Sequence, residues 1–278
     1  MKPIEAYIRY IKYIRGYSQN TIKAYETDLR NFASWQQQHT PEARWSTTTR
    51  ADIDAYIEDM SKQGAKPSTT NRQLASISGI YCFFQREGLD IDNPVRYESR
   101  RKNPDTIPNT IPAEDLRKAY RNTAGVAKYM VGMFMTTGIR LQELLDITWE
   151  DIDFDNNSIK IHGKGSKERT VYTTADVLER LAEYRYEKTA TGRVLRFCQR
   201  KAREIIYTTL RPFTRAKQVS PHAIRHTYAT EMAKAGHNAT TIAKALGHKR
   251  IDTTQKYINM AEIEASQRSF ANLIKKAS

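Results

Sequence analysis

Prolines gather at one place in the 278-residue chain, and that place limits the fold more than any other feature. Four of the nine prolines lie between residues 94 and 112, among the basic residues Arg96, Arg100, Arg101 and Lys102. Because proline ends helices and stiffens an extended segment, we expect two units, 1–95 and 112–278, joined by a basic linker over 96–111. Such a linker would let the units close around a rod-like polyanion, although an ordinary interdomain linker has the same composition.

The first unit has the apolar periodicity of a helical domain. Four expected helices carry apolar side chains at helical spacing: Ile4, Ile8 and Ile11; Ile22, Tyr25, Leu29 and Phe32; Ile53, Tyr56, Ile57 and Met60; Leu74, Ile77, Tyr81 and Phe84. Gly16 ends the first pattern, and Ser18 offers an N-cap for the second. We interpret these aromatic stripes as core.

The second unit mixes helices with one hairpin. We expect a helix after Pro112, with Leu116 and Tyr120 facing inward, and an apolar helix over 126–135. Gly138 separates that helix from the next one. Residues 158–173 alternate like two strands around a glycine-rich turn, and the pattern beyond them is helical. The predicted fold class is mainly α, with a small antiparallel sheet.

The charge of the chain is strongly and unevenly positive. The formal net charge is +14, and the sequence pI is about 9.7. Residues 1–100 carry 14 basic and 12 acidic side chains, whereas residues 101–278 carry 31 and 19. Such an imbalance is typical of a surface that meets phosphates, although a solvated basic face would look the same.

Several classes of protein are excluded by composition. No apolar run approaches the roughly 20 residues of a membrane span, and the start of the chain is not a signal peptide. Two cysteines, Cys82 and Cys198, are too few for a disulfide framework or a four-cysteine zinc site. We therefore expect a cytoplasmic protein with no membrane partner.

Two basic residues stand where an anion would bind. Arg140 begins a helix after Gly138, and a helix N-terminus favours anions. Glu143, one turn on, could hold its guanidinium, or the two could form a plain surface ion pair. Lys164 lies at the hairpin tip between two glycines that let the backbone approach a ligand. A solvated tip would use the same residue.

A second group of residues lies at a strong helix start, where Ser220 is a good N-cap. His222 and Arg225 then project from one face of the first turn. His222 and His226 also have the spacing of two zinc ligands. However, Ala223 occupies the position of the glutamate in a zinc protease motif, and no third ligand is evident. We expect no metal here, and we interpret His226 as a packing residue.

Two further residues complete a possible phosphodiester site. His248 follows a glycine-capped helix end, and Tyr257 lies nine residues further on. Arginines can bind phosphate oxygens bidentately, histidine exchanges protons near neutral pH, and lysine can protonate a departing alkoxide. A tyrosine can attack phosphorus and hold it covalently. These residue types together suit transesterification without a metal.

The sequence as a whole resembles the tyrosine recombinases, the family of phage integrases and Xer-type recombinases. The resemblance covers almost the whole chain in an ordered set of motifs: SQNTIKAYETDLRNFASW, TGIRLQELLDITWEDID, GKGSKER, HAIRHTYAT and LGHKRIDTTQKYI. It implies a two-domain clamp around double-stranded DNA. An N-terminal core-binding domain of SAM-like type would precede a mostly helical catalytic domain with a small sheet.

The resemblance also implies roles for six residues. Arg140 and Arg225 would bind the scissile phosphate, and His248 would hydrogen-bond to it. Tyr257 would form a 3′-phosphotyrosyl intermediate. The remaining two residues would move protons, Lys164 as general acid on the 5′-hydroxyl and His222 near the tyrosine. Religation would then need no ATP, metal or other cofactor.

Assembly follows from the same resemblance. Active members work as tetramers on two duplexes, through a Holliday junction, and some pair with a related recombinase. The tail over 261–278, with Ile263, Phe270 and Leu273, could dock into a neighbouring protomer or pack on its own subunit. No arm-binding domain is evident before the first helix, which favours a simple Xer-like system.

Three other functions fit parts of the sequence. A type IB topoisomerase shares the tyrosine chemistry but relaxes supercoils without exchanging strands. A non-catalytic DNA-binding regulator would lose nothing on Tyr257→Phe. A metal nuclease would use Asp151, Asp153 and Asp155, acids that more simply cap a turn. The complete motif set favours the recombinase.

Overall fold

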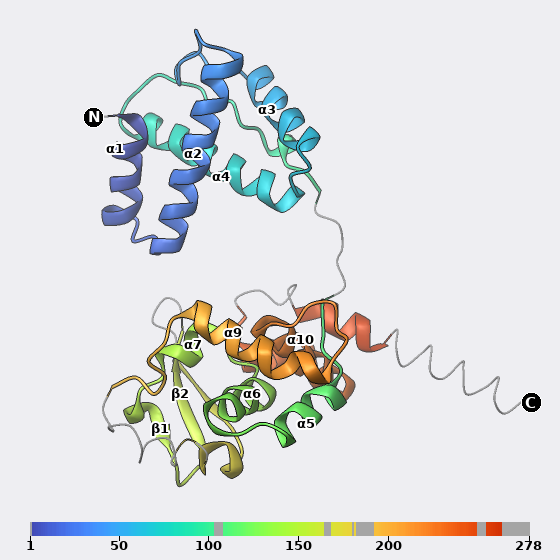
Figure 1. The fold of residues 1–278 in the computed structure, drawn as a ribbon. Coiled ribbons are helices and arrows are strands. Elements are labelled where there is room, and N and C mark those ends of the chain that lie inside the picture. The colour runs from blue at the N-terminus through green and yellow to red at the C-terminus, as the bar shows by residue number, and fades with distance from the viewer. Residues whose placement is uncertain are drawn as a thin grey trace, which may run out of the picture. The chain divides into compact units, whose positions relative to one another are not determined.

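The computed structural model describes residues 2–102, 108–163, 168–179, 181, 192–248 and 254–262. The chain divides into two compact units, Met1–Asp105 and Thr106–Ser278, each with its own hydrophobic core (Figure 1). The domain boundaries that we expect at residues 95 and 112 stay predictions. Within the described ranges, no helix combines the length and apolar character needed to cross a membrane.

The N-terminal unit is helical, as its periodicity predicts. It contains α1 (Pro3–Arg9), the π-helical turn η1 (Tyr10–Ile14), α2 (Gln19–His39), α3 (Arg50–Lys62) and α4 (Pro67–Arg86). The predicted stripes supply most of its core: Ile22, Leu29, Phe32, Ile53, Tyr56, Met60, Leu74, Ile77, Tyr81 and Phe84. Phe32, Tyr56, Tyr81 and Phe84 of these stripes are core, as predicted, whereas Tyr25 is half-buried against it. In the first helix, however, Tyr7 and Ile11 are the buried residues, and Ile4 and Ile8 are only half-buried.

The segment after α4 is hydrogen-bonded to the N-terminal unit. It forms a short 3₁₀ turn, η2 (Tyr97–Ser99). The side chain of Asn71 in α4 donates to the carbonyl of Arg101 at 2.7 Å and accepts from its N–H at 2.8 Å. Part of the predicted linker therefore packs on α4 rather than running free.

The C-terminal unit is mostly helical. Its labelled helices are α5 (Ala113–Arg121), α6 (Gly125–Thr137), α7 (Leu141–Asp146), η3 (Trp149–Asp151), α9 (Gln199–Leu210), η4 (Arg211–Phe213), α10 (Pro221–Lys234) and α11 (Ala239–Leu246). Residues 175–179 and 254–262 are also helical. The apolar helix α6 is buried over most of its second half and packs against α5, α9 and α10 (Figure 1). It forms the centre of this core.

A three-stranded antiparallel sheet completes the unit, in the order β1 (Ile152–Asp153), β2 (Ser158–His162) and β3 (Glu168–Tyr172). The predicted hairpin is confirmed as β2 and β3, and the short β1 adds a strand that the alternation did not reveal. The register pairs Ile159 with Val171, both buried. The hairpin tip that carries Lys164 lies outside the described residues.

Candidate active site

The junction between α6 and α7 sets the position of Arg140. Gly138 ends α6 with a φ of +58°, a left-handed conformation that favours glycine. A Cβ at this position would lie 2.4 Å from a ring carbon of Tyr228 and 2.8 Å from the side chain of Leu246. The left-handed turn at Gly138 ends α6, and Arg140 two residues later is the N-cap of α7.

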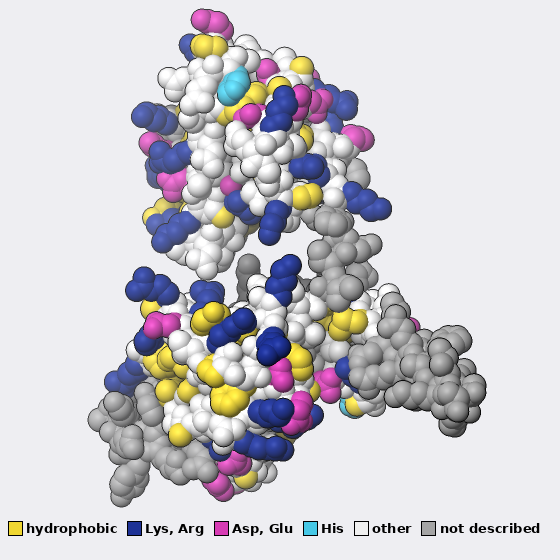
Figure 2. Space-filling model, turned by 45° about the vertical axis from the view of Figure 1, so that its right-hand side comes forward, with side chains coloured by type: hydrophobic (Ala, Val, Ile, Leu, Met, Phe, Trp, Pro, Cys, Tyr) yellow, Lys and Arg dark blue, Asp and Glu magenta, His cyan; other side chains and the backbone are white. Residues whose placement is uncertain are grey.

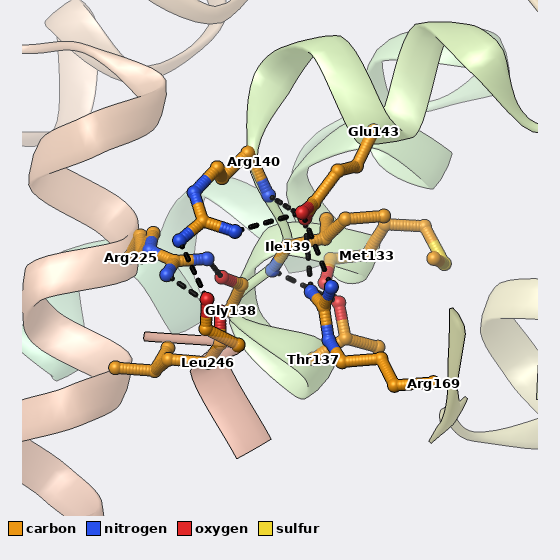
Figure 3. A network of polar contacts seen from close by, with 10 residues as sticks. Met133, Thr137, Gly138, Ile139, Arg140, Glu143, Arg169, Arg225 and Leu246 are labelled. Carbon is orange, nitrogen blue, oxygen red and sulfur yellow. Dashed lines mark hydrogen bonds and ion pairs between the residues drawn. The ribbon is translucent and has the colours of Figure 1, made fainter. Parts of the chain in front are cut away.

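Glu143 is a buried carboxylate that holds two arginines (Figure 3). It accepts the backbone N–H of Arg140 at 2.9 Å and the guanidinium of Arg140 at 2.8 Å. Arg169 of β3 donates to both carboxylate oxygens, at 3.1 and 2.9 Å. Burial acts to raise the pKa of Glu143, but the bonds from Arg169 and Arg140 outweigh it and lower the pKa to about 2. A plain surface ion pair is therefore the wrong interpretation of Arg140 and Glu143.

Arg225 is buried in the first turns of α10. Ser220 accepts the N–H of Ala223 as N-cap, and Pro221 follows, as predicted. The guanidinium of Arg225 donates to the carbonyl of Gly138 at 2.6 Å and to that of Leu246 at 2.8 Å (Figure 3). Burial and the nearby Arg140 lower its pKa to about 10, so Arg225 stays cationic at neutral pH.

Two helix ends supply the acceptors for these arginines. The carbonyls of Gly138 and Leu246 lie at the C-termini of α6 and α11, where the helix dipole is negative and backbone acceptors are free. Arg140 also donates to the carbonyl of Gly247, at 2.9 Å. Among the described residues, the network thus contains three fixed guanidinium groups and one carboxylate, Glu143, and this excess of positive charge favours an anion.

Two histidines lie close to the arginines. Burial and the charge of Arg225 lower the pKa of His222, which lies in the first turn of α10. The same two causes lower the pKa of His248 to about 4. Its Nδ1 lies 2.9 Å from the hydroxyl of Thr254. Both imidazoles are therefore mostly neutral at pH 7, able to donate one hydrogen bond and accept another.

Tyr257 lies in the helix over 254–262 and is buried among apolar residues of α10 and α11. Its hydroxyl is 2.5 Å from Nδ1 of His226. Burial raises the pKa of Tyr257, and Arg225 opposes that shift. His226 is therefore more than a packing residue, because it also forms a hydrogen bond with Tyr257.

Five of the six predicted site residues lie in the described part of the chain, and they come together in one place: Arg140, His222, Arg225, His248 and Tyr257. Lys164, the sixth, lies outside the described residues. Arg169 and His226 were not among the predicted site residues. Strand alternation could have indicated Arg169, because it shares a face of β3 with the buried Val171.

The alternating acids before the hairpin have structural partners. Asp151 forms a capping box with Thr148 and accepts from His162 at 2.8 Å. Asp153 accepts from Asn156. In the part of the chain that the structure describes, no three His, Cys, Asp or Glu side chains form a metal-ligand group. Asp151 and Asp153 therefore stabilise a turn.

Comparison with known families places both units of the chain. The model of the phage integrase family matches residues 111–263, more than half of the chain. The model of the N-terminal SAM-like domain of phage integrases matches residues 4–88. The chain therefore belongs to the phage integrase family, the tyrosine recombinases that cleave and rejoin DNA.

Individual relatives align over nearly the full length. Tyrosine recombinase XerD of Oceanobacillus iheyensis is 25% identical, over 93% of this chain and 94% of the relative. Tyrosine recombinase XerC of Lactobacillus delbrueckii subsp. bulgaricus is 27% identical, over 92% and 94%. The chain is thus similar to Xer recombinases along both of its units.

Solved structures confirm the predicted fold class. XerH bound to a palindromic difH substrate has a TM-score of 0.75 at 16% identity, covering 96% of this chain and 84% of that one. A lambda integrase dimer bound to a core site has a TM-score of 0.70 at 16% identity, covering 92% and 94%. At these identities the likeness shows the fold.

Proposed function

We propose that this site-specific recombinase breaks DNA by attack of the Tyr257 hydroxyl on a phosphodiester. The oxygen of Tyr257 would bond to phosphorus as the bond to the 5′-oxygen breaks, leaving a 3′-phosphotyrosyl enzyme and a free 5′-hydroxyl. The observation that carries this proposal is the cluster of fixed arginines beside Glu143, which lies close to both neutral histidines and to Tyr257.

Arg140 and Arg225 would bind the non-bridging oxygens of the scissile phosphate. Their guanidinium groups are oriented before DNA arrives, because protein carbonyls and Glu143 already hold them. Donors that are fixed in advance need no reorganisation as charge develops in the transition state. His248 would add a neutral hydrogen-bond donor to the same phosphate.

Proton transfer would fall to His222 and Lys164. His222 lies beside His226, the partner of Tyr257, with ring centroids 4.1 Å apart. It is mostly neutral at pH 7, so it can accept the phenolic proton as the negative phosphate arrives. Lys164 would protonate the 5′-oxygen, a role that rests on the family resemblance.

Rejoining would reverse these steps on a new strand. The 5′-hydroxyl of a partner strand would attack the phosphotyrosyl phosphorus and release Tyr257. One phosphodiester is exchanged for another at each step, so neither ATP nor a metal is required. Exchange of one pair of strands and then of the other would carry recombination through a Holliday junction.

The partner would be double-stranded DNA, bound in the cytoplasm by a tetramer on two duplexes or by a pair of related recombinases. The net charge of +14 supports DNA binding, and Lys and Arg side chains dot the visible face of each unit (Figure 2). Affinity should then fall steeply with salt, with a slope of roughly 0.9 per phosphate contacted.

Covalent capture tests the proposal. Wild type and Tyr257→Phe are mixed with nicked fragments of source DNA in EDTA and denatured in SDS, and the attached DNA is sequenced. We expect adducts from wild type and none from Tyr257→Phe. Tyr228→Phe is the matched control, since Tyr228 is a partly buried neighbour in the same cluster. Adducts from Tyr257→Phe, or dependence on a metal, would contradict the proposal.

A further inference from the structure

The hydroxyl of Tyr257 points into the protein. The residue is 2% exposed and packs with Ala229, Ile242 and Leu246. Attack on phosphorus needs the reacting atoms roughly 3–3.5 Å apart and in line. The hydroxyl is hydrogen-bonded to the buried His226, so this bond must break before Tyr257 can present its oxygen to a phosphodiester.

His226 is the group that holds this hydroxyl. It lies on α10 directly after Arg225 and is 9% exposed. Its ring is packed on one side by the ring of His222, edge to face, with centroids 4.1 Å apart. The imidazole therefore has little freedom, and Nδ1 offers a fixed partner to Tyr257.

Burial is the main reason that both partners of this bond are neutral. Burial, His222 and Lys256 lower the pKa of His226 to about 3, with Arg225 and His248 acting the same way. Burial raises the pKa of Tyr257. The phenol therefore keeps its proton, and with His226 in its Nε2–H tautomer the hydroxyl donates a hydrogen bond to Nδ1. In this arrangement His226 is too weak a base to remove the proton.

We propose that His226 is a positioning residue that holds the Tyr257 hydroxyl inside the DNA-free protein, so that attack requires this hydrogen bond to break. The inference rests on the proposed role of Tyr257 as nucleophile. It assigns to His226 a restraint on the resting enzyme, separate from the phosphate contacts of Arg225 and the proton transfer of His222.

Two substitutions separate the bond from the packing. His226→Leu fills a similar volume and removes the acceptor, whereas His226→Asn keeps an acceptor near the place of Nδ1. Thr230→Val is the matched control, because it removes another buried hydrogen bond of α10 and leaves Tyr257 untouched. Circular dichroism checks folding, and His226→Gln, whose amide is displaced from that position, repeats the test if the leucine variant does not fold.

The first readout is the exposure of Tyr257 without DNA. Proteins labelled with 3-fluorotyrosine are titrated with a soluble gadolinium chelate, and the ¹⁹F signal of Tyr257 is assigned by its loss in Tyr257→Phe. We expect the chelate to broaden this signal in His226→Leu and to leave it sharp in wild type, His226→Asn and Thr230→Val. An equally protected signal in His226→Leu would overturn the inference.

The second readout is the initial rate of covalent attachment to the nicked fragments. We expect His226→Leu to react faster by up to about tenfold, the factor that one net hydrogen bond supplies, and His226→Asn to match wild type. If His226→Leu reacts more slowly than wild type and His226→Asn reacts at the wild-type rate, His226 assists the reaction instead of restraining Tyr257, and the inference is wrong. If His226→Leu exposes Tyr257 but no variant attaches DNA, the proposed nucleophile fails while the positioning role stands.

Discussion

Among the residues that the structure describes, each unit buries one carboxylate, Asp28 or Glu143, and the surroundings of the two differ. Asp28 in α2 is 1% exposed and pairs with Arg72, which is 43% exposed. One oxygen of Asp28 has no hydrogen-bond partner among the described residues, and burial raises its pKa despite Arg72. Glu143 is 7% exposed, yet its bonds to Arg140 and Arg169 lower its pKa to about 2.

The difference shows what a buried charge requires. One partly exposed arginine does not offset the desolvation of Asp28, whereas several converging donors more than offset that of Glu143. The N-terminal unit rests on apolar packing and tolerates one poorly paired acid. The C-terminal unit builds a charged network whose excess of arginines remains available to a phosphate.

The largest effect should come from Arg225→Lys. A lysine cannot hold the carbonyls of Gly138 and Leu246 and also bind a phosphate with two donors. We expect the rate of covalent attachment to fall by on the order of 10²–10³, the usual loss for one fixed donor. Arg72→Lys in the other unit is the control and should leave this rate, at saturating DNA, near wild type. Equal rates for both variants would contradict the claim that the arginines of the C-terminal unit bind the phosphate.

The next effect concerns stability. Glu143→Gln leaves Arg140 and Arg169 poorly compensated and should cost about 3–5 kcal/mol of the free energy of unfolding of the C-terminal unit. Asp28→Asn should change the N-terminal unit by less than about 1 kcal/mol, because its burial is already unfavourable. Urea titration followed by the indole N–H signals of Trp149 and of Trp35 and Trp45 reports each unit separately. A similar loss for both variants would contradict this account.

Acid should unfold the C-terminal unit first. The folded-state pKa of Glu143 is below its ordinary 4.5, so its stabilisation, about 3 kcal/mol, is complete above pH 4.5 and lost as the pH falls toward 2. The lowered pKa values of His226 and His248 change stability in the same direction, because protonating these buried imidazoles costs stability as the pH falls below 6.5. The raised pKa of Asp28 changes stability in the opposite direction, since protonation in acid removes its buried charge.

The indole signals in mild urea measure this order between pH 7 and pH 3. Trp149 should lose its native signal at higher pH than Trp35 and Trp45. Glu143→Gln should reduce the pH dependence of the C-terminal unit below pH 4.5. Loss of the Trp35 and Trp45 signals first would reverse the comparison.

The smallest effect compares two N-caps. Ser18 caps α2, and Ser220 caps α10, each by accepting a backbone N–H. Replacing either serine by alanine should cost about 1 kcal/mol. Only Ser220→Ala should also lower the yield of covalent adduct, because the first turn of α10 carries His222 and Arg225. Thermal melts and adduct yields, measured on the same two variants, check this.

Local sequence predicted what depends on local physics. The stripes of α2 to α4, the cap at Ser220 and the glycine end at Gly247 follow from spacing and backbone preference. Two pairings of the site could not be predicted this way. Arg169 reaches Glu143 across 26 residues, and His226 reaches Tyr257 across 31, so both depend on how separate elements pack.

The most direct test of the central claim is to identify the amino acid that bonds to DNA. Wild-type adducts are digested with nuclease and protease, and the peptide that carries a nucleotide is sequenced by mass spectrometry. We predict one modified residue, Tyr257, among the 16 tyrosines of the chain. A nucleotide on any other residue would contradict the account.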